Sequence, residues 1–159
     1  MRARTRAACQ KYNVGLIIVD YLQLLTVPGN ANLTEKTTEK ANAAKALAQD
    51  FRVPVLALSQ LSRELEKDGN RKPRLSDLRE SGAIEQAANI VMFLHSLPYS
   101  EADEQAGCLA PVDLLVEANR NGPTGRVPLQ WHKPLFRFLP KAYSQPTPPA
   151  QPQQRRYDP

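Results

Sequence analysis

Three short runs of mostly apolar residues, at 16–19, 53–58 and 90–94, divide the chain into segments. Each run is shorter than a typical helix and lacks the strict alternation of a half-exposed strand. Such runs are typical of strands that are covered on both faces of a parallel sheet. The pattern therefore predicts three buried strands, and the first two are followed at once by polar residues.

The segment between the first two runs, "TEKTTEKANAAKALAQDF", predicts a helix at 34–51. It is rich in helix formers. We expect Thr34, with Thr37 and Thr38, to cap its start. Its apolar or small positions recur at helical spacing and predict one buried face, formed by Ala41, Ala44, Leu47, Ala48 and Phe51.

The remaining segments complete an α/β pattern. Residues 1–13 resemble the end of a helix, and "AIEQAA" predicts one or two further helical turns. "VDLLVEANRNGPTGRVPLQW" predicts a β-hairpin that turns at 121–123, and "LFRFLP" predicts a short strand. We therefore expect an α/β fold with a mostly parallel sheet flanked by helices and a C-terminal β-hairpin.

Domain boundaries follow from composition. Residues 1–139 form one predicted domain, and residues 140–159, rich in Pro and Gln, are predicted to be disordered. A net charge of +5 is compatible with a polyanionic partner but does not require one.

Cellular location follows from what the sequence lacks. Cys9 and Cys108 form no metal-ligand spacing with His95 and His132, so two reduced thiols are expected. The start has no apolar signal region, and no apolar run approaches the roughly 20 residues that span a bilayer. We therefore expect a soluble, cytoplasmic protein without a membrane partner.

The polar residues that end the first two strands are the first candidates for chemistry. Asp20 follows the first run, and Ser59 and Gln60 follow the second. Ligands of parallel α/β sheets bind beyond the carboxyl ends of the strands. A charge next to a buried run is costly unless it is paired or binds something. The candidates for Asp20 are a helix cap, a salt bridge and a metal site, and this stretch taken alone favours a cap or a salt bridge.

Four segments, in this order, resemble the motor domain of the DnaB family of bacterial and phage replicative helicases: "GLIIVDYLQLL", "VPVLALSQLSRELE", "RKPRLSDLRESGAIEQAANIVMFL" and "NRNGPTGRVPL". The resemblance covers 1–139. It implies a RecA-like P-loop NTPase fold that couples ATP hydrolysis, with Mg²⁺, to the unwinding of duplex DNA in replication. It also implies single-stranded DNA and other helicase subunits, in a hexameric ring, as partners.

The resemblance assigns three residues to the nucleotide. Asp20 resembles the Walker B aspartate, which would hold Mg²⁺ through water. Gln60 resembles the residue that senses the γ-phosphate, and Arg120 resembles the arginine finger that reaches the ATP site of the neighbouring subunit. The alternatives are a paired or capping Asp20, a solvated Gln60 at the end of its strand, and a solvated Arg120 in its turn. Because an arginine finger must be free to reach the next subunit, we expect Arg120 to be exposed at the edge of the hairpin and to have no partner in its own chain.

A second group resembles the segment that touches single-stranded DNA in the ring pore. Arg79, Glu80 and Gly82 belong to it, and Lys72 and Arg74 are expected to help. Arginine would meet phosphate by charge, and glycine would let the backbone approach closely. The alternative is a solvated loop of mixed charge. Few aromatic residues are interleaved here, so base stacking is not predicted.

Two departures from the family pattern limit what the chain can do alone. No G-x-x-x-x-G-K-[ST] phosphate loop and no upstream catalytic glutamate occur in these 159 residues, and the start resembles the middle of a family helix. Ala118 stands two positions before Arg120, where relatives carry Lys. We therefore expect an N-terminally truncated motor domain that is inactive by itself.

The missing phosphate-loop strand also has a structural consequence. In the family it lies between the strands that match 53–58 and 89–94, so we expect a gap there.

Two other functions stay open: a non-enzymatic fragment that docks into a helicase ring or binds DNA, and another RecA-type ATPase. "SDLRESGAIEQ" speaks against the second, because it is a signature of replicative helicases.

Overall fold

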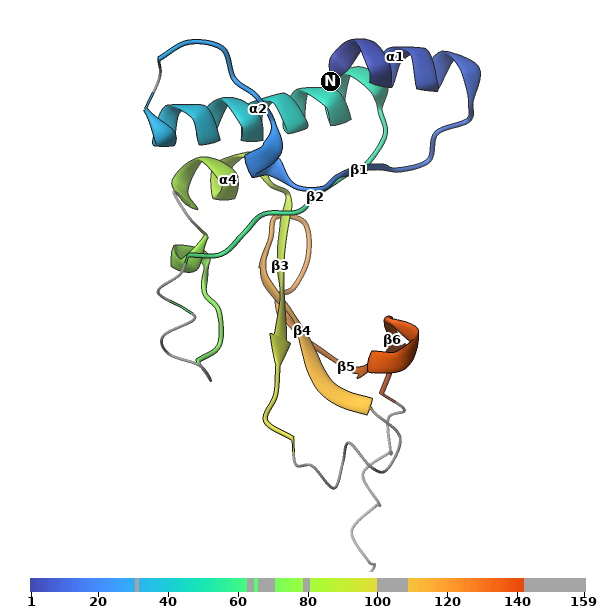
Figure 1. Cartoon of the computed structure of the whole chain (residues 1–159), viewed down its shortest axis with the longest axis vertical. Coiled ribbons are helices and arrows are strands. Elements are labelled where there is room, and N and C mark those ends of the chain that lie inside the picture. The colour runs from blue at the N-terminus through green and yellow to red at the C-terminus, as the bar shows by residue number, and fades with distance from the viewer. Residues whose placement is uncertain (31, 63–64, 66–70, 79–80, 100–108, 142–159) are drawn as a thin grey trace, which may run out of the picture.

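The computed structural model describes residues 1–30, 32–62, 65, 71–78, 81–99 and 109–141. Helices gather at one end of the molecule, and a long antiparallel sheet projects away from them (Figure 1). Helix α1 (Arg2–Lys11) comes first and confirms the predicted N-terminal helix. Within the described part of the chain, no helix has both the length and the apolar content that crossing a bilayer requires.

Helix α2 (Leu33–Phe51) begins one residue before the predicted start and uses a different cap. The side chain of Asn32 accepts a hydrogen bond from the backbone N–H of Glu35 at 2.8 Å, and Glu35 Oε2 accepts one from the N–H of Asn32 at 3.0 Å. This reciprocal pair satisfies two N–H groups that the helix leaves unpaired. The expectation that Thr34 caps the helix is therefore wrong, because Thr34 lies inside the first turn.

One face of α2 is buried, as predicted. Ala41, Ala44 and Leu47 are 4 %, 8 % and 2 % exposed, respectively. Ala41 and Ala44 pack in a core with residues of both sheets and of α4 (Ser81–Ala87): Val19, Leu22, Leu78, Ile84, Val91, Phe93 and Leu115. The small side chains on α2 let the helix lie close to its neighbours.

The first sheet consists of β1 (Ile17–Val19) and β2 (Val55–Ala57), which pair in parallel as predicted. The 3₁₀ turn η1 (Leu22–Leu24) follows β1, and its first N–H donates to the carbonyl of Leu58 at 2.9 Å. Within the described part of the chain, one face of this sheet is covered and the other is not. Val19 is 7 % exposed, whereas its neighbour Ile18 is 60 % exposed. Burial on both faces, which the apolar run predicted, is therefore not observed.

The second sheet begins with β3 (Ile90–Ser96). Strands β4 (Leu109–Asn119) and β5 (Gly125–His132) form the predicted hairpin, and β6 (Arg137–Pro140) is the predicted short strand. The order is β3–β4–β5–β6, and the sheet is antiparallel throughout. The 3₁₀ turns η2 (Leu75–Asp77) and η3 (Lys133–Leu135) complete the described elements. The α/β class is confirmed, but the parallel part is smaller than expected and is confined to β1 and β2.

Strands β2 and β3 (Ile90–Ser96) do not pair with each other in the described residues. Each is the edge strand of its own sheet, so the expected gap between 53–58 and 89–94 is confirmed. On β3, Met92 and Leu94 are 44 % and 52 % exposed. The proposed tail begins at Pro140, and residues 142–159 lie outside the described residues.

Candidate functional site

Asp20 and Gln60 lie at the same edge of the parallel sheet. Val19 is in register with Ala57, so Asp20 and Leu58 are the next positions along the two strands, and Gln60 follows two residues later. The N–H of Leu58 donates to the carbonyl of Val19 at 2.9 Å, which extends the pairing to this edge. Both Asp20 and Gln60 are exposed. The strands therefore place a carboxylate and an amide, both exposed, beyond the same edge of the sheet.

Gln23, which the sequence did not single out, connects the two strand ends. Its Nε2 donates to Ser59 Oγ at 3.0 Å, and its Oε1 accepts a hydrogen bond from the N–H of Gln60 at 3.4 Å. Lys40 on α2 donates to the carbonyl of Gln23 at 2.8 Å. A side-chain amide can both donate and accept, so Gln23 fixes the path of the chain on both sides of the edge. The polar Gln23 inside "YLQLL" was the available signal.

The surroundings of Asp20 fit a magnesium ion bound through water. Asp20 has no hydrogen-bond or ion-pair partner among the described residues, so its carboxylate oxygens are available. Mg²⁺ keeps several waters and takes one or two carboxylates. Among the described residues, no three or more His, Cys, Asp or Glu side chains gather into a group that could hold a metal ion.

Arg120 follows β4 at the turn of the hairpin and is exposed, as expected. Its backbone N–H donates to the carbonyl of Asn89 at 2.9 Å. Its guanidinium donates to the carbonyl of Gln86, at the end of α4. The expectation that Arg120 points at no partner of its own is therefore wrong. The hydrogen bond to a neutral carbonyl holds the guanidinium against α4 without neutralising its charge.

A shallow cavity of about 340 Å³ surrounds this arginine. Glu85 and Gln86 of α4 form one wall, and Asn119 and Arg120 form the other. Ala118 lines the cavity too, pairs with Val91 across the strands and packs against the core. Because Ala118 carries only a methyl group, it adds no positive charge, and Arg120 is the one cationic residue among the described residues that line this cavity.

The residues expected to touch DNA are only partly described. Lys72 and Arg74 are exposed in the segment before η2, and Gly82 is exposed in α4, where a Cβ would meet nothing within 4 Å. The open space at Gly82 is compatible with the close approach of another backbone. Arg79 and Glu80 lie outside the described residues.

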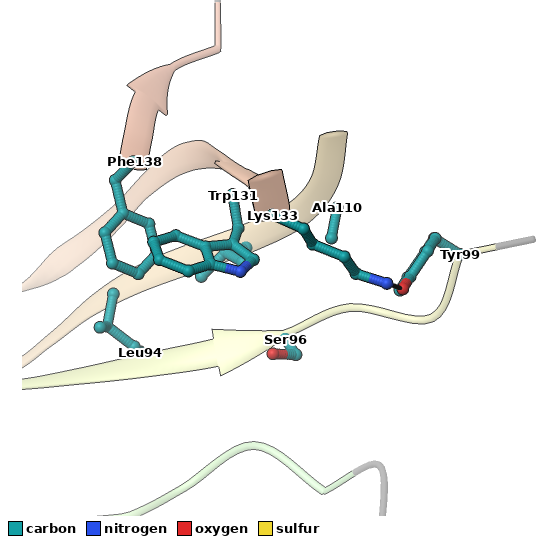
Figure 2. Close-up of a pocket in the computed structure, with 8 residues that line it drawn as sticks. Leu94, Ser96, Tyr99, Ala110, Trp131, Lys133 and Phe138 are labelled. Atoms are coloured by element: carbon teal, nitrogen blue, oxygen red, sulfur yellow. Dashed lines mark hydrogen bonds between the residues drawn. The ribbon is translucent and has the colours of Figure 1, made fainter. Parts of the chain in front are cut away.

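A second cavity, of about 300 Å³, lies on the antiparallel sheet and shares no residue with these sites (Figure 2). The ring of Trp131 lies 4.6 Å from that of Phe138 and 5.9 Å from that of Phe136, centre to centre. Lys133 Nζ lies 4.6 Å from the centre of the Tyr99 ring and bonds its hydroxyl. These contacts pack the rim of the cavity, and they join β5 to β6 and η3 to the segment that follows β3.

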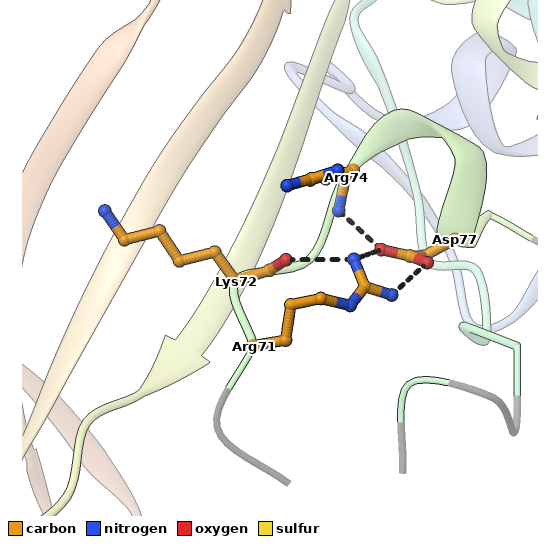
Figure 3. A network of polar contacts seen from close by, with 4 residues as sticks. All are labelled: Arg71, Lys72, Arg74 and Asp77. Atoms are coloured by element: carbon orange, nitrogen blue, oxygen red, sulfur yellow. Dashed lines mark hydrogen bonds and ion pairs between the residues drawn. The ribbon is translucent and has the colours of Figure 1, made fainter. Parts of the chain in front are cut away.

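Asp77 organises the segment that carries Lys72 and Arg74 (Figure 3). Arg71 binds it with both terminal nitrogens, Nη2 to Oδ1 at 2.7 Å and Nη1 to Oδ2 at 3.0 Å. The backbone N–H of Arg74 donates to Oδ2 at 2.7 Å. The hydrogen bonds from Arg71, followed by that from Arg74, lower the pKa of Asp77 below its ordinary value despite its burial. Asp77 is therefore ionised and fully engaged at neutral pH.

Comparison with known proteins gives a consistent family. The family described as DnaB-like helicase C terminal domain matches residues 1–140. The replicative DNA helicase DnaB of Geobacillus stearothermophilus is 39 % identical over 141 residues, which cover 87 % of this chain and 31 % of that protein. The Pasteurella multocida DnaB is 43 % identical over 141 residues, covering 87 % and 30 %. The chain thus spans about a third of the length of these relatives.

Solved structures agree with the sequence matches. A solved ATPase domain matches with a TM-score of 0.72 and 34 % identity, over 87 % of this chain and 49 % of that one. A DnaB-like replicative helicase, described together with its interactions with primase, matches with a TM-score of 0.67 and 34 % identity, over 81 % and 31 %. The expected RecA-like architecture is confirmed, and the chain belongs to the family of DnaB-like helicase C-terminal domains.

Proposed function

We propose that the chain is the C-terminal part of a replicative helicase motor that couples ATP hydrolysis to DNA unwinding. The observation that carries this proposal is the shared edge of β1 and β2, where Asp20 and Gln60 are exposed together and Gln23 connects the two strand ends. An acceptor and an amide at one rim suit an Mg²⁺-bound nucleotide. Family membership supports the same reading.

In the proposed reaction each residue has a separate task. Asp20 would accept hydrogen bonds from the water shell of Mg²⁺, which supplies positive charge to the phosphates when bound. The Gln60 amide would follow the γ-phosphate, because it can donate to a phosphate oxygen and accept from water. Gln23 would keep Gln60 at a fixed distance from the sheet. None of these side chains replaces a phosphate loop.

Arg120 would stabilise charge on the phosphoryl group of the neighbouring subunit's nucleotide. Its single side-chain partner among the described residues is the carbonyl of Gln86, a neutral acceptor that a phosphate oxygen can displace. The proposal therefore includes a small rearrangement, in which the guanidinium leaves α4 when a neighbouring subunit docks.

Because the 159 residues contain no phosphate loop, we propose that the chain alone does not hydrolyse ATP. The test is an ATPase assay of the purified chain with Mg²⁺, alongside Asp20→Ala. Both samples are expected at the same background rate. Mg²⁺-dependent hydrolysis that Asp20→Ala abolishes would overturn the proposed dependence on another polypeptide segment.

The proposal also includes single-stranded DNA as a partner, through Arg79 with Lys72 and Arg74. Few phosphates are neutralised per chain, so we expect weak binding and a shallow decrease of affinity with salt. Fluorescence anisotropy with labelled oligothymidylate at low salt measures both. Arg79→Ala should weaken binding several-fold, and unchanged affinity would remove this segment from the DNA contact.

A second candidate function is non-enzymatic docking into a helicase ring. The unpaired edges of β2 and β3 and the exposed apolar side chains of β3 favour it. Mixing the chain with an intact DnaB-like helicase distinguishes the two. Inhibition of that helicase without any gain of activity supports docking, and added ATPase activity that depends on Asp20 supports the motor.

A further inference from the structure

Asp77 is a buried, hydrogen-bonded carboxylate to which the proposed reaction assigns no role. It is 6 % exposed, and the exposed fraction of its side chain is 9 %. A buried charge is tolerated only when it is paired and hydrogen-bonded. Three hydrogen bonds, two from Arg71 and one from the backbone of Arg74, meet this requirement. The arrangement closes residues 71–77 into a loop around one carboxylate (Figure 3).

The loop carries one cation that pairs with Asp77 and two that face solvent. The Arg71 side chain is 31 % exposed and forms an ion pair with Asp77. Lys72 and Arg74 flank Pro73 and are exposed, and in Figure 3 the Lys72 side chain extends away from the carboxylate. Asp77 therefore fixes the backbone from which the two outward cations project.

Asp77 also connects this loop to the chain that follows Gln60 at the edge of the parallel sheet. The carbonyl of Asp77 accepts a hydrogen bond from the N–H of Ser62 at 2.8 Å, and Leu61 forms an antiparallel bridge with Leu78. Leu78 is 5 % exposed and belongs to the core. Leu61 directly follows Gln60, and Leu78 directly precedes Arg79. Asp77 thus lies where the chain after Gln60 meets the chain before Arg79.

We infer that Asp77 is a positioning residue for DNA binding: it orients Lys72 and Arg74 and holds Leu78 against the chain that follows Gln60. This inference rests on the proposed DNA contact. It makes a prediction opposite in sign to simple electrostatics. Removing a negative charge next to a DNA site, and releasing Arg71, should tighten binding to a polyanion. Loss of positioning should weaken it.

The experiment measures oligothymidylate binding by anisotropy at low salt for the wild-type chain, Asp77→Asn and Arg71→Lys. We expect several-fold weaker binding for both variants. Arg71→Lys keeps every charge but loses the bidentate fork, so its effect cannot be electrostatic. Glu39→Gln, an exposed carboxylate on α2, is the matched control and should bind as well as wild type or slightly tighter.

Hydrogen exchange gives the second measurement. The amides of Arg74 and Ser62 should exchange faster in Asp77→Asn, while the α2 amides stay protected, which also excludes global unfolding. Equal or tighter DNA binding by Asp77→Asn, with wild-type binding intact, would overturn the inference alone. Absence of binding by the wild-type chain would instead overturn the proposed DNA contact on which the inference rests.

Discussion

At the scale of single residues, side-chain amides and carboxylates fix the places where strands end. Gln23 hydrogen-bonds Ser59 and the backbone of Gln60, and Asp77 binds Arg71 and the backbone of Arg74. Neither Gln23 nor Asp77 is a candidate for nucleotide contact. Each holds the chain beside a candidate contact residue. Gln23 holds Gln60, a candidate for nucleotide contact, and Asp77 holds Arg74, a candidate for DNA contact.

Gln23→Ala tests the first of these roles. The variant loses two hydrogen bonds in a half-buried setting, and we expect the free energy of unfolding to fall by about 1 kcal/mol. Urea denaturation followed by circular dichroism measures it. Gln49→Ala, at an exposed position of α2, is the control and should stay within about 0.5 kcal/mol of wild type. Equal stability of the two variants would contradict the bridging role.

The pH dependence of stability tests Asp77. Its pKa is lower in the folded chain than its ordinary value of about 3.9, because Arg71 and Arg74 stabilise the carboxylate. Its contribution is therefore fully present above the unfolded pKa and is lost as pH falls through the folded pKa. The stability difference between wild type and Asp77→Asn should be constant from about pH 5 to 8 and shrink below about pH 4. A difference that grows on acidification would contradict the pairing.

At the scale of elements, local chemistry determines where helices start. The helix at 34–51 was predictable because its small and apolar residues recur on one helical face and because the segment is rich in strong helix-forming residues. Its cap was not, because Asn32 and three threonines compete within the first turns, and only the reciprocal bond with Glu35 decides between them.

Asn32→Ala against Thr34→Ala tests this assignment. Loss of the capping side chain should lower the free energy of unfolding by about 1 kcal/mol. Thr34→Ala, inside an exposed helical turn, should be neutral or slightly stabilising, since alanine is the better helix former. Thermal melts followed at helical wavelengths compare them, and a larger loss in Thr34→Ala would restore the predicted cap.

The pairing of strands shows where sequence reasoning stops. All-apolar runs predicted burial on both faces, yet Ile18 and Leu94 are 60 % and 52 % exposed. An all-apolar run indicates that both faces of a strand suit burial. It does not indicate which segment would cover each face. Asp113, 1 % exposed within β4 and bound to Arg126 at 3.3 Å, was likewise not predicted, because a single buried carboxylate in a mostly apolar strand has no characteristic spacing.

The candidate sites were predictable to different degrees. Asp20 and Gln60 were expected at one edge of the sheet, and the parallel register of β1 and β2 places them there. The Arg120 contact with Gln86 was not expected, because it depends on how closely the hairpin turn approaches α4. Residue types and strand order predict an edge, whereas side-chain partners across separate elements require the packing itself.

At the scale of the whole molecule, the described residues form two sheets that share no strand. Edge strands with apolar side chains are sites of association unless they are covered. We expect the isolated chain to self-associate. Size-exclusion chromatography with light scattering measures the association, and Met92→Lys on β3 should shift the population toward monomer. A wild-type chain that stays monomeric would contradict this expectation.

The central claim is that Asp20 and Gln60 form one half of a nucleotide site whose phosphate-binding segment comes from outside these 159 residues. The most direct measurement is Mg²⁺-dependent ATP hydrolysis by the chain mixed with a polypeptide from a DnaB-like relative that carries the phosphate loop and lacks the part matched here. We predict activity only in the mixture, abolished by Asp20→Asn and retained in Glu39→Gln. Hydrolysis by the chain alone that needs Asp20, or mixed activity indifferent to Asp20→Asn, would contradict the claim.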